Sequence, residues 1–250
     1  MQPRIPSSIE NQYAFLRWKD RFYLHARWRL CPFLLIEQYI PQRGTIIDVG
    51  CGYGMLAHLL AQKPERTVIG IDASPKRITI AQYSARGKQN LYFEHMKVQD
   101  LHLEAYDAIV MSDFLHHIPF HDQETLIQQA KQKLKPDGIL IIQDIDKRPT
   151  WKYLIAAGLD TLLNWFPYLY YRKKTNFKHL LERNGFDVLT VNADRGLPLP
   201  DVLFICTKSL EVPIPLPPEP ERFFEEELPE VIEVQPRKPI ELKDEELFYS

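Results

Sequence analysis

Short apolar runs, most of them rich in β-branched residues, alternate with amphipathic stretches between about residues 45 and 208. The short runs predict strands and the amphipathic stretches predict helices. This alternation is typical of a mostly parallel sheet whose two faces are both covered by helices. The predicted strands are residues 45–50, 67–72, 91–95, 106–112, 138–144, 186–193 and 201–208.

The last two predicted strands are joined by a short link, from about Asp194 to Pro200. A parallel pair needs a crossover of a dozen or more residues, so this link is too brief for one. The sequence therefore predicts an antiparallel hairpin at the end of the sheet.

A glycine-rich loop follows the first predicted strand. The strand ends in Asp48, and Gly50, Gly52 and Gly54 alternate before a predicted helix over residues 55–61. Glycines allow a sharp turn and close approach of a ligand, and the helix directs its N-terminal N–H groups at the loop. The dinucleotide fingerprint is G-x-G-x-x-G, whereas the third glycine comes one residue earlier here. The loop therefore favours a small polar cofactor over a pyrophosphate.

The second predicted strand ends in another carboxylate, Asp72, and Ser74-Pro75 then opens a helix with a cap and a first-turn proline. An acid at this position of an α/β unit is placed to accept hydrogen bonds from the two hydroxyls of a ribose. The two features together indicate an adenosine site.

Three further segments complete an ordered set of motifs: residues 93–101, residues 106–119 with Ser112-Asp113-Phe114-Leu115-His116-His117, and residues 134–140. The set resembles the class I S-adenosylmethionine-dependent methyltransferases, in the branch of the ubiquinone and menaquinone biosynthesis enzymes. The resemblance covers about residues 40–208. It implies an α/β, Rossmann-like, seven-stranded and mostly parallel sheet with an antiparallel terminal hairpin and helices on both faces.

The resemblance also implies a site for S-adenosylmethionine. Asp48 and the glycine loop would hold the methionine part, Asp72 the ribose and Asp100 the adenine amino group, although Asp100 also fits a solvated loop acid. Ala73 and Leu101 would form apolar walls for adenine, and Met111 and Ser112 would line the far side through their backbone. The loop residues concerned are Gly50, Cys51, Gly52 and Gly54.

Methyl transfer needs a base only when the acceptor carries a proton that must leave. His117 is the first candidate for that base and His121 the second, and a structural histidine at a helix start is the alternative. Asp113, His116 and His117 align with a metal-associated cluster of ubiquinone-type O-methyltransferases. A histidine replaces the second acid of that cluster here, so no metal is expected.

The front of the chain, residues 1–40, interleaves basic and aromatic side chains between residues 15 and 29. We expect a helical lid over the cofactor, with Tyr23, His25 or Arg27 facing the crevice. Packing of the aromatic residues without a chemical role is the alternative.

An aromatic insert, residues 151–171, follows the fifth predicted strand and ends in a basic cluster at residues 172–174. Polar residues and a proline interrupt it, so it is a poor transmembrane span. It suits peripheral membrane contact or the wall of a pocket for a lipid-like acceptor, and a covered core helix is the alternative.

The net charge of −2 conceals an acidic tail. Residues 211–250 hold 12 of the 33 acidic and 4 of the 31 basic residues, which leaves 21 acids and 27 bases in the body. Eight of the 20 prolines also lie there, so the tail is expected to be extended and largely disordered. Its apolar residues leave open a contact with the body or with a protein partner. The predicted division is a lid (1–40), a methyltransferase domain (41–210) and a tail (211–250).

These features favour an enzyme that methylates a small apolar or aromatic acceptor, at oxygen rather than nitrogen or carbon. The basic body leaves RNA or DNA methylation as an alternative, but the Asn/Asp-Pro-Pro-aromatic loop that holds a flipped base is missing. A cofactor-binding scaffold with a recruiting tail is a second alternative. Three scattered cysteines and a start without a long apolar run favour a cytoplasmic location.

Overall fold

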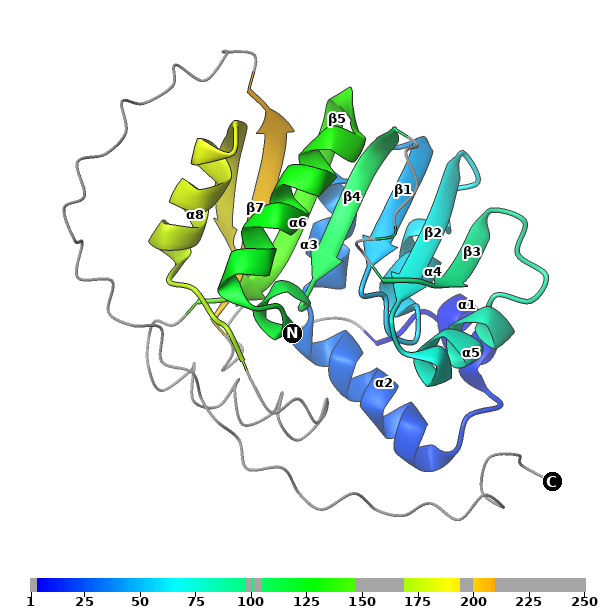
Figure 1. The fold of residues 1–250 in the computed structure, drawn as a ribbon. Coiled ribbons are helices and arrows are strands. Elements are labelled where there is room, and N and C mark those ends of the chain that lie inside the picture. Colours follow the sequence, from blue (N-terminus) through cyan, green and yellow to red (C-terminus); the bar gives the residue numbers. More distant parts are fainter. Residues whose placement is uncertain (1–3, 98–99, 101–104, 147–168, 194–199, 210–250) are drawn as a thin grey trace, which may run out of the picture.

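A computed structural model describes residues 4–97, 100, 105–146, 169–193 and 200–209. Seven strands form one sheet: β1 (Gly44–Val49), β2 (Arg66–Asp72), β3 (Leu91–His95), β4 (Tyr106–Ser112), β5 (Leu134–Ile145), β6 (Phe186–Asn192) and β7 (Asp201–Lys208). Their order across the sheet is β3-β2-β1-β4-β5-β7-β6 (Figure 1).

The first five strands pair in parallel, and β7 lies antiparallel to both β5 and β6. The predicted sheet and its terminal hairpin are therefore confirmed. One strand is longer than expected, because β5 begins at Leu134 rather than at residue 138. Leu134 pairs with Tyr106 before a register shift, and a side chain on Gly138 would lie only 2.9 Å from the Tyr106 carbonyl oxygen.

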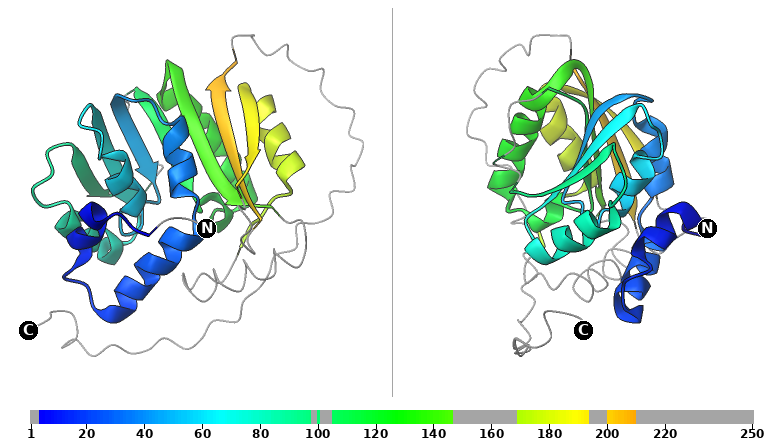
Figure 2. Two further views of the ribbon diagram at one scale, coloured as in Figure 1. Left: turned by 180° about the vertical axis from the view of Figure 1, so that it is seen from behind. Right: turned by 90° about the vertical axis from the view of Figure 1, so that its right-hand side faces the viewer.

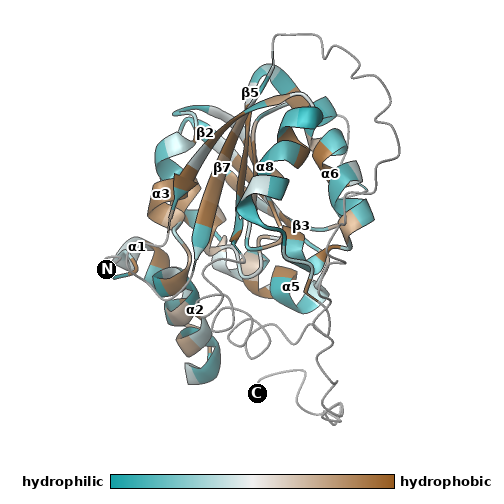
Figure 3. Ribbon diagram, turned by 90° about the vertical axis from the view of Figure 1, so that its left-hand side faces the viewer, coloured by the Kyte–Doolittle hydropathy of each residue, from teal (hydrophilic) through white to brown (hydrophobic). Residues whose placement is uncertain are grey.

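Helices cover both faces of the sheet. The α-helices of the described residues are α1 (Ser7–Glu10), α2 (Trp18–Leu30), α3 (Phe33–Tyr39), α4 (Met55–Leu60), α5 (Pro75–Ser84), α6 (Phe120–Lys133) and α8 (Lys174–Arg183). Buried residues of α1 to α5 form one core cluster, and those of α6 and α8 form a second cluster across the sheet. Figure 2 shows α6 and α8 on the opposite side from α3 and α4. Figure 3 shows apolar strands between helices that carry many polar residues.

The α2 helix lies beyond the ends of the strands rather than on a face of the sheet (Figure 1). The arrowheads of β1 and β4 point toward it, so it faces the carboxyl ends of the parallel strands. Open α/β sheets bind their ligands at that edge. None of the helices in the described ranges is long and apolar enough to cross a bilayer.

Candidate functional site

A cavity of about 300 Å³ opens at the carboxyl edge of the sheet. Seven of the predicted cofactor residues line it: Asp48, Gly50, Cys51, Gly52, Asp72, Ala73 and Ser112. His117, from the segment after β4, lines it as well. The structure therefore brings the two carboxylates, the glycine loop and the candidate base to one cavity.

The glycine loop has a backbone that disfavours side chains. Gly50, Gly52 and Gly54 adopt φ values of +73°, +58° and +86°. Two aromatic rings also pack closely against the loop. A Cβ atom added at Gly50 would lie 2.3 Å from the Phe114 ring, and one added at Gly54 would lie 2.3 Å from the Phe93 ring. Glycine is required at these two positions by conformation and by space.

Replacing Gly54 with alanine is expected to lower the free energy of unfolding by about 2–4 kcal/mol, from left-handed strain and the clash with Phe93. Gly87→Ala is the matched control. Gly87 has a similar φ of +82°, but no atom lies within 4 Å of an added Cβ, so about 1–2 kcal/mol is expected from strain alone. Urea unfolding measures both variants. Equal losses would show that Phe93 does not crowd the loop.

Asp72 ends β2, where the predicted helix cap fixes the following turn. Its Oδ1 accepts a hydrogen bond from the Ser74 N–H at 2.8 Å, and its Oδ2 accepts one from the Gly52 N–H at 3.0 Å. The guanidinium of Arg77, in the first turn of α5, lies 4.0 Å from Oδ2. The carboxylate is thus held between the loop and α5, with lone pairs left for the two hydroxyls of a ribose.

Asp48 is the second carboxylate of the cavity and is 2% exposed. Its buried Oδ2 has no hydrogen-bond partner among the described residues. Burial, and next the nearby Asp72 carboxylate, raise the pKa of Asp48 to about 7. A buried acceptor of this kind suits a cationic ligand group, such as the ammonium of the methionine part of the cofactor.

The raised pKa of Asp48 makes the free energy of unfolding of the ligand-free protein depend on pH. The folded state holds this proton more tightly than the unfolded chain, whose pKa is near 3.8. The stabilising contribution is therefore complete below the unfolded pKa and is lost as pH rises through about 7. Relative to Asp48→Asn, the wild type should lose stability from about pH 5 to about pH 8, as urea unfolding at both values would measure. If the wild type instead became more stable relative to Asp48→Asn over this range, the buried environment that raises the pKa of Asp48 would be contradicted.

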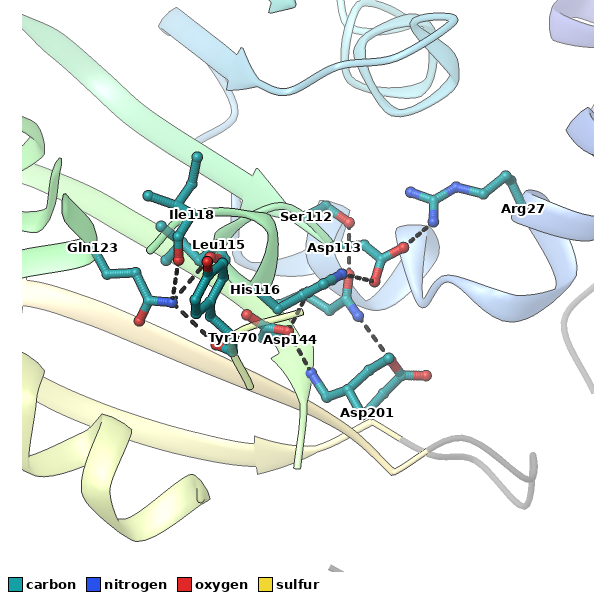
Figure 4. A network of polar contacts seen from close by, with 12 residues as sticks. Arg27, Ser112, Asp113, Leu115, His116, Ile118, Gln123, Asp144, Tyr170 and Asp201 are labelled. Carbon is teal, nitrogen blue, oxygen red and sulfur yellow. Dashed lines mark hydrogen bonds and ion pairs between the residues drawn. The ribbon is translucent and has the colours of Figure 1, made fainter. Parts of the chain in front are cut away.

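A network of polar and ionisable side chains joins Arg27 and Asp113, two residues of the cavity lining, to His116 and Asp144 (Figure 4). Arg27 of α2 donates a hydrogen bond to Asp113, which follows β4. The fully buried His116 hydrogen-bonds through Nδ1 to Asp144 at 2.7 Å, and its Nε2 lies 3.8 Å from Asp113. Its ring stacks on Tyr171 with centroids 4.5 Å apart.

Two buried glutamines, Gln123 and Gln143, add further hydrogen bonds around this network (Figure 4). Ser112 Oγ donates to Gln143 Oε1 at 2.8 Å, and Gln143 Nε2 donates to Asp201 Oδ1 at 2.7 Å. Burial, followed by the Asp113 carboxylate, raises the pKa of Asp201 well above its usual value. Gln123 Nε2 also donates to the carbonyl oxygens of Leu115, Ile118 and Tyr170. The segment that carries His116 and His117 is thus fixed by side chains from several elements.

The remaining predicted site residues lie elsewhere. Gly54 is buried and does not line the cavity, and Met111 is 1% exposed within the core cluster that contains residues of α6. Asp100 is exposed and does not line the cavity. His121 has an 83% exposed side chain that pairs with Asp122 at 2.9 Å. Leu101 lies outside the described residues.

Of the three lid candidates, Tyr23 and Arg27 line the cavity, whereas His25 pairs with Glu10 at 3.3 Å. Sequence reasoning did not single out Tyr53, Arg77, Lys97 or Phe114, all of which line the cavity. Tyr53 stands between two glycines of the loop, a signal that could have revealed it. Among the described residues no three His, Cys, Asp or Glu side chains form a group that could hold a metal ion.

Residues 17–191 match the model of a family described as a methyltransferase domain. The chain belongs to this family of S-adenosylmethionine-dependent enzymes, and the expected cofactor is confirmed with it. The buried acceptor of Asp48 and the carboxylate of Asp72 fit the ammonium and the ribose of that cofactor.

The chain is similar to proteins named ubiquinone biosynthesis O-methyltransferase. It is 32% identical to that of Haemophilus ducreyi over 130 residues, which are 49% of this chain and 54% of the relative. It is 28% identical to that of Leptothrix cholodnii over 178 residues, or 67% and 74% of the two chains. The chain thus spans little more than half the length of the first relative.

The fold is also that of a TehB-like S-adenosylmethionine-dependent methyltransferase from Corynebacterium glutamicum, with a TM-score of 0.56 at 18% identity. That match covers 80% of this chain and 98% of the other. At this identity the likeness concerns the fold alone.

Proposed function

We propose that the protein transfers a methyl group from S-adenosylmethionine to an oxygen of a small apolar or aromatic acceptor. The observation that carries this proposal is the single cavity lined by Asp48, Asp72 and His117. Cofactor residues and a candidate base that share one cavity can act on two ligands placed side by side, which supplies much of the rate through proximity.

Asp72 would bind the ribose hydroxyls and Asp48 the ammonium, while the backbone of the glycine loop lies against the ligand. When bound, S-adenosylmethionine supplies an activated methyl group on a sulfonium. The chain therefore has to hold the ligands in line and exclude water. The role of Asp100 toward adenine remains part of the proposal, although Asp100 is exposed in this structure.

His117 would accept the proton of the acceptor hydroxyl on a ring nitrogen. Apolar side chains line the same cavity, among them Phe33, Phe114 and Ile118, so the acceptor face suits an apolar or aromatic molecule. His121 lies outside the cavity lining and is the weaker candidate for this proton transfer.

Residues 1–40 would act as the lid of the site. Four contacts tie this segment to the site. They join Arg27 with Asp113, Asp20 Oδ1 with the Tyr53 hydroxyl at 3.1 Å, the ring of Tyr23 with that of Tyr53 at 5.0 Å, and the Tyr13 hydroxyl with the Tyr53 carbonyl oxygen at 2.8 Å. A helix held in this way keeps water from the reacting groups.

Oxygen as the acceptor atom is supported by the names of the relatives, which are O-methyltransferases of ubiquinone biosynthesis. A lipid-like acceptor and peripheral membrane contact through residues 151–174 remain predictions, because residues 147–168 lie outside the described part of the chain. The same holds for a protein partner of the tail. A cytoplasmic location is also an expectation.

Two measurements test the proposed function. Calorimetry should detect binding of S-adenosylmethionine and S-adenosylhomocysteine. Incubation with methyl-deuterated S-adenosylmethionine and a small-molecule extract should then label a metabolite, and hydriodic acid should release the label if it lies on oxygen. Cofactor binding without transfer would favour the scaffold. Label in nucleic acid, in a parallel incubation with cellular RNA and DNA, would favour the RNA or DNA alternative.

A further inference from the structure

Arg27 is a cation in the lining of the cavity, and the proposed chemistry does not yet use it. Its side chain is 16% exposed, it lines the cavity, and it comes from α2 rather than from the sheet. Among the described residues, the hydrogen bond that the guanidinium makes runs from Nη1 to Asp113. A guanidinium has five N–H donors, so most of them remain for a ligand.

Asp113 holds this guanidinium from an unusual backbone conformation. It has a φ of +54°, the single positive φ among the described residues other than glycine. Its N–H donates to the Gln143 carbonyl oxygen at 2.9 Å, which fixes the turn after β4 to β5. Left-handed strain of this kind persists where the surroundings over-determine it, and it concentrates at functional sites.

Several charged or titratable groups surround Arg27. Asp113 faces it from the end of β4, Tyr23 and Cys31 lie near it in the front segment, and Asp48 and Asp201 interact with it from β1 and β7. The Asp113 carboxylate already pairs with the guanidinium. A permanently charged acceptor carboxylate would meet that like charge, whereas a neutral hydroxyl could enter and ionise beside the guanidinium.

We propose that Arg27 binds the acceptor oxygen and stabilises it as an anion, so that the protein selects hydroxyl groups that ionise readily over aliphatic alcohols. This inference rests on the proposed O-methylation. Arginine remains charged at all working pH values, so Arg27 does not take the proton. That proton passes to His117, and the oxygen keeps its electron pair beside the guanidinium. Asp113 positions the guanidinium.

The test uses 4-nitrophenol, whose phenolate absorbs visible light, with saturating S-adenosylhomocysteine and no turnover. Spectrophotometric pH titration should show that the bound probe ionises at a pH lower than the free probe by about one unit or more, as expected near an opposite charge. Arg27→Met should abolish the shift and Arg27→Lys should retain part of it. Arg21→Met is the matched control, because Arg21 is exposed on the same helix and absent from the cavity lining.

Asp113→Asn gives an effect of opposite sign, and asparagine tolerates the left-handed backbone. Loss of the negative charge should lower the pKa of the bound probe further. Equal probe pKa values in the wild type and Arg27→Met, or no binding of the probe by the wild type, would overturn the inference. Calorimetry with S-adenosylhomocysteine on the same samples is the separate check, since loss of that binding would contradict the proposed function itself.

Discussion

Asp72→Ala is expected to weaken binding of S-adenosylhomocysteine by about 30- to 800-fold. The variant loses two charge-assisted hydrogen bonds to the ribose, or about 2–4 kcal/mol. It also leaves the Gly52 and Ser74 N–H groups without the carboxylate that now accepts their hydrogen bonds. Asp72→Asn is therefore measured as well, because asparagine keeps the size and shape of the side chain and one acceptor oxygen. Calorimetry gives the dissociation constants.

Asp107 provides the control carboxylate. It accepts hydrogen bonds from the Thr45 N–H and from Lys135, and it lies near the amino end of β4, outside the cavity lining. Asp107→Asn should therefore cost stability and leave cofactor affinity within about twofold of the wild type, a margin typical of sites that do not couple. Unchanged affinity in Asp72→Ala would mean that other residues hold the ribose.

His117→Ala is expected to reduce turnover by about 10²- to 10⁴-fold, the usual contribution of a positioned general base. Cofactor affinity should stay close to that of the wild type, because His117 is not among the residues that hold the cofactor in the proposal. Turnover with a labelled methyl donor and calorimetry on the same samples separate the two quantities.

The exposed His121 supplies the control for that variant. His121→Ala should retain turnover, and a chelator should have no effect on either protein. A large loss in His121→Ala with activity retained in His117→Ala would reverse the assignment of the base. Chelator-sensitive activity restored by a divalent ion would instead favour a metal site at Asp113, His116 and His117.

Local sequence signals predicted the sheet, and they also predicted several residues that the structure brings to one cavity. Asp48, the alternating glycines and the Ser74 cap lie within about 30 residues, and each has a conformational preference that tertiary contacts reinforce here. The segment after β4 was also located correctly, since His117 lines the cavity.

Local sequence signals could not predict contacts between residues that are far apart in the sequence. Arg27 meets Asp113 across 86 positions and Gln143 meets Asp201 across 58. The rings of Phe93 and Phe114 press on the glycine loop, yet nothing in their own segments indicates that placement. The sequence also did not predict which of the candidate residues are buried: Met111 lies in the core, and Asp100 is exposed.

The attachment of the front segment to the glycine loop has a consequence for synthesis of the chain. The Tyr13 hydroxyl donates to the Tyr53 carbonyl oxygen at 2.8 Å, and Tyr13 and Trp28 are 2% and 1% exposed. Ribosomes produce these residues before the strands and helices that bury them. During synthesis the apolar side chains of the front segment therefore stay exposed to solvent, and the segment can pack against the glycine loop only after that loop has been synthesised. Chaperones that recognise aromatic and basic stretches could therefore bind this segment before the loop has emerged.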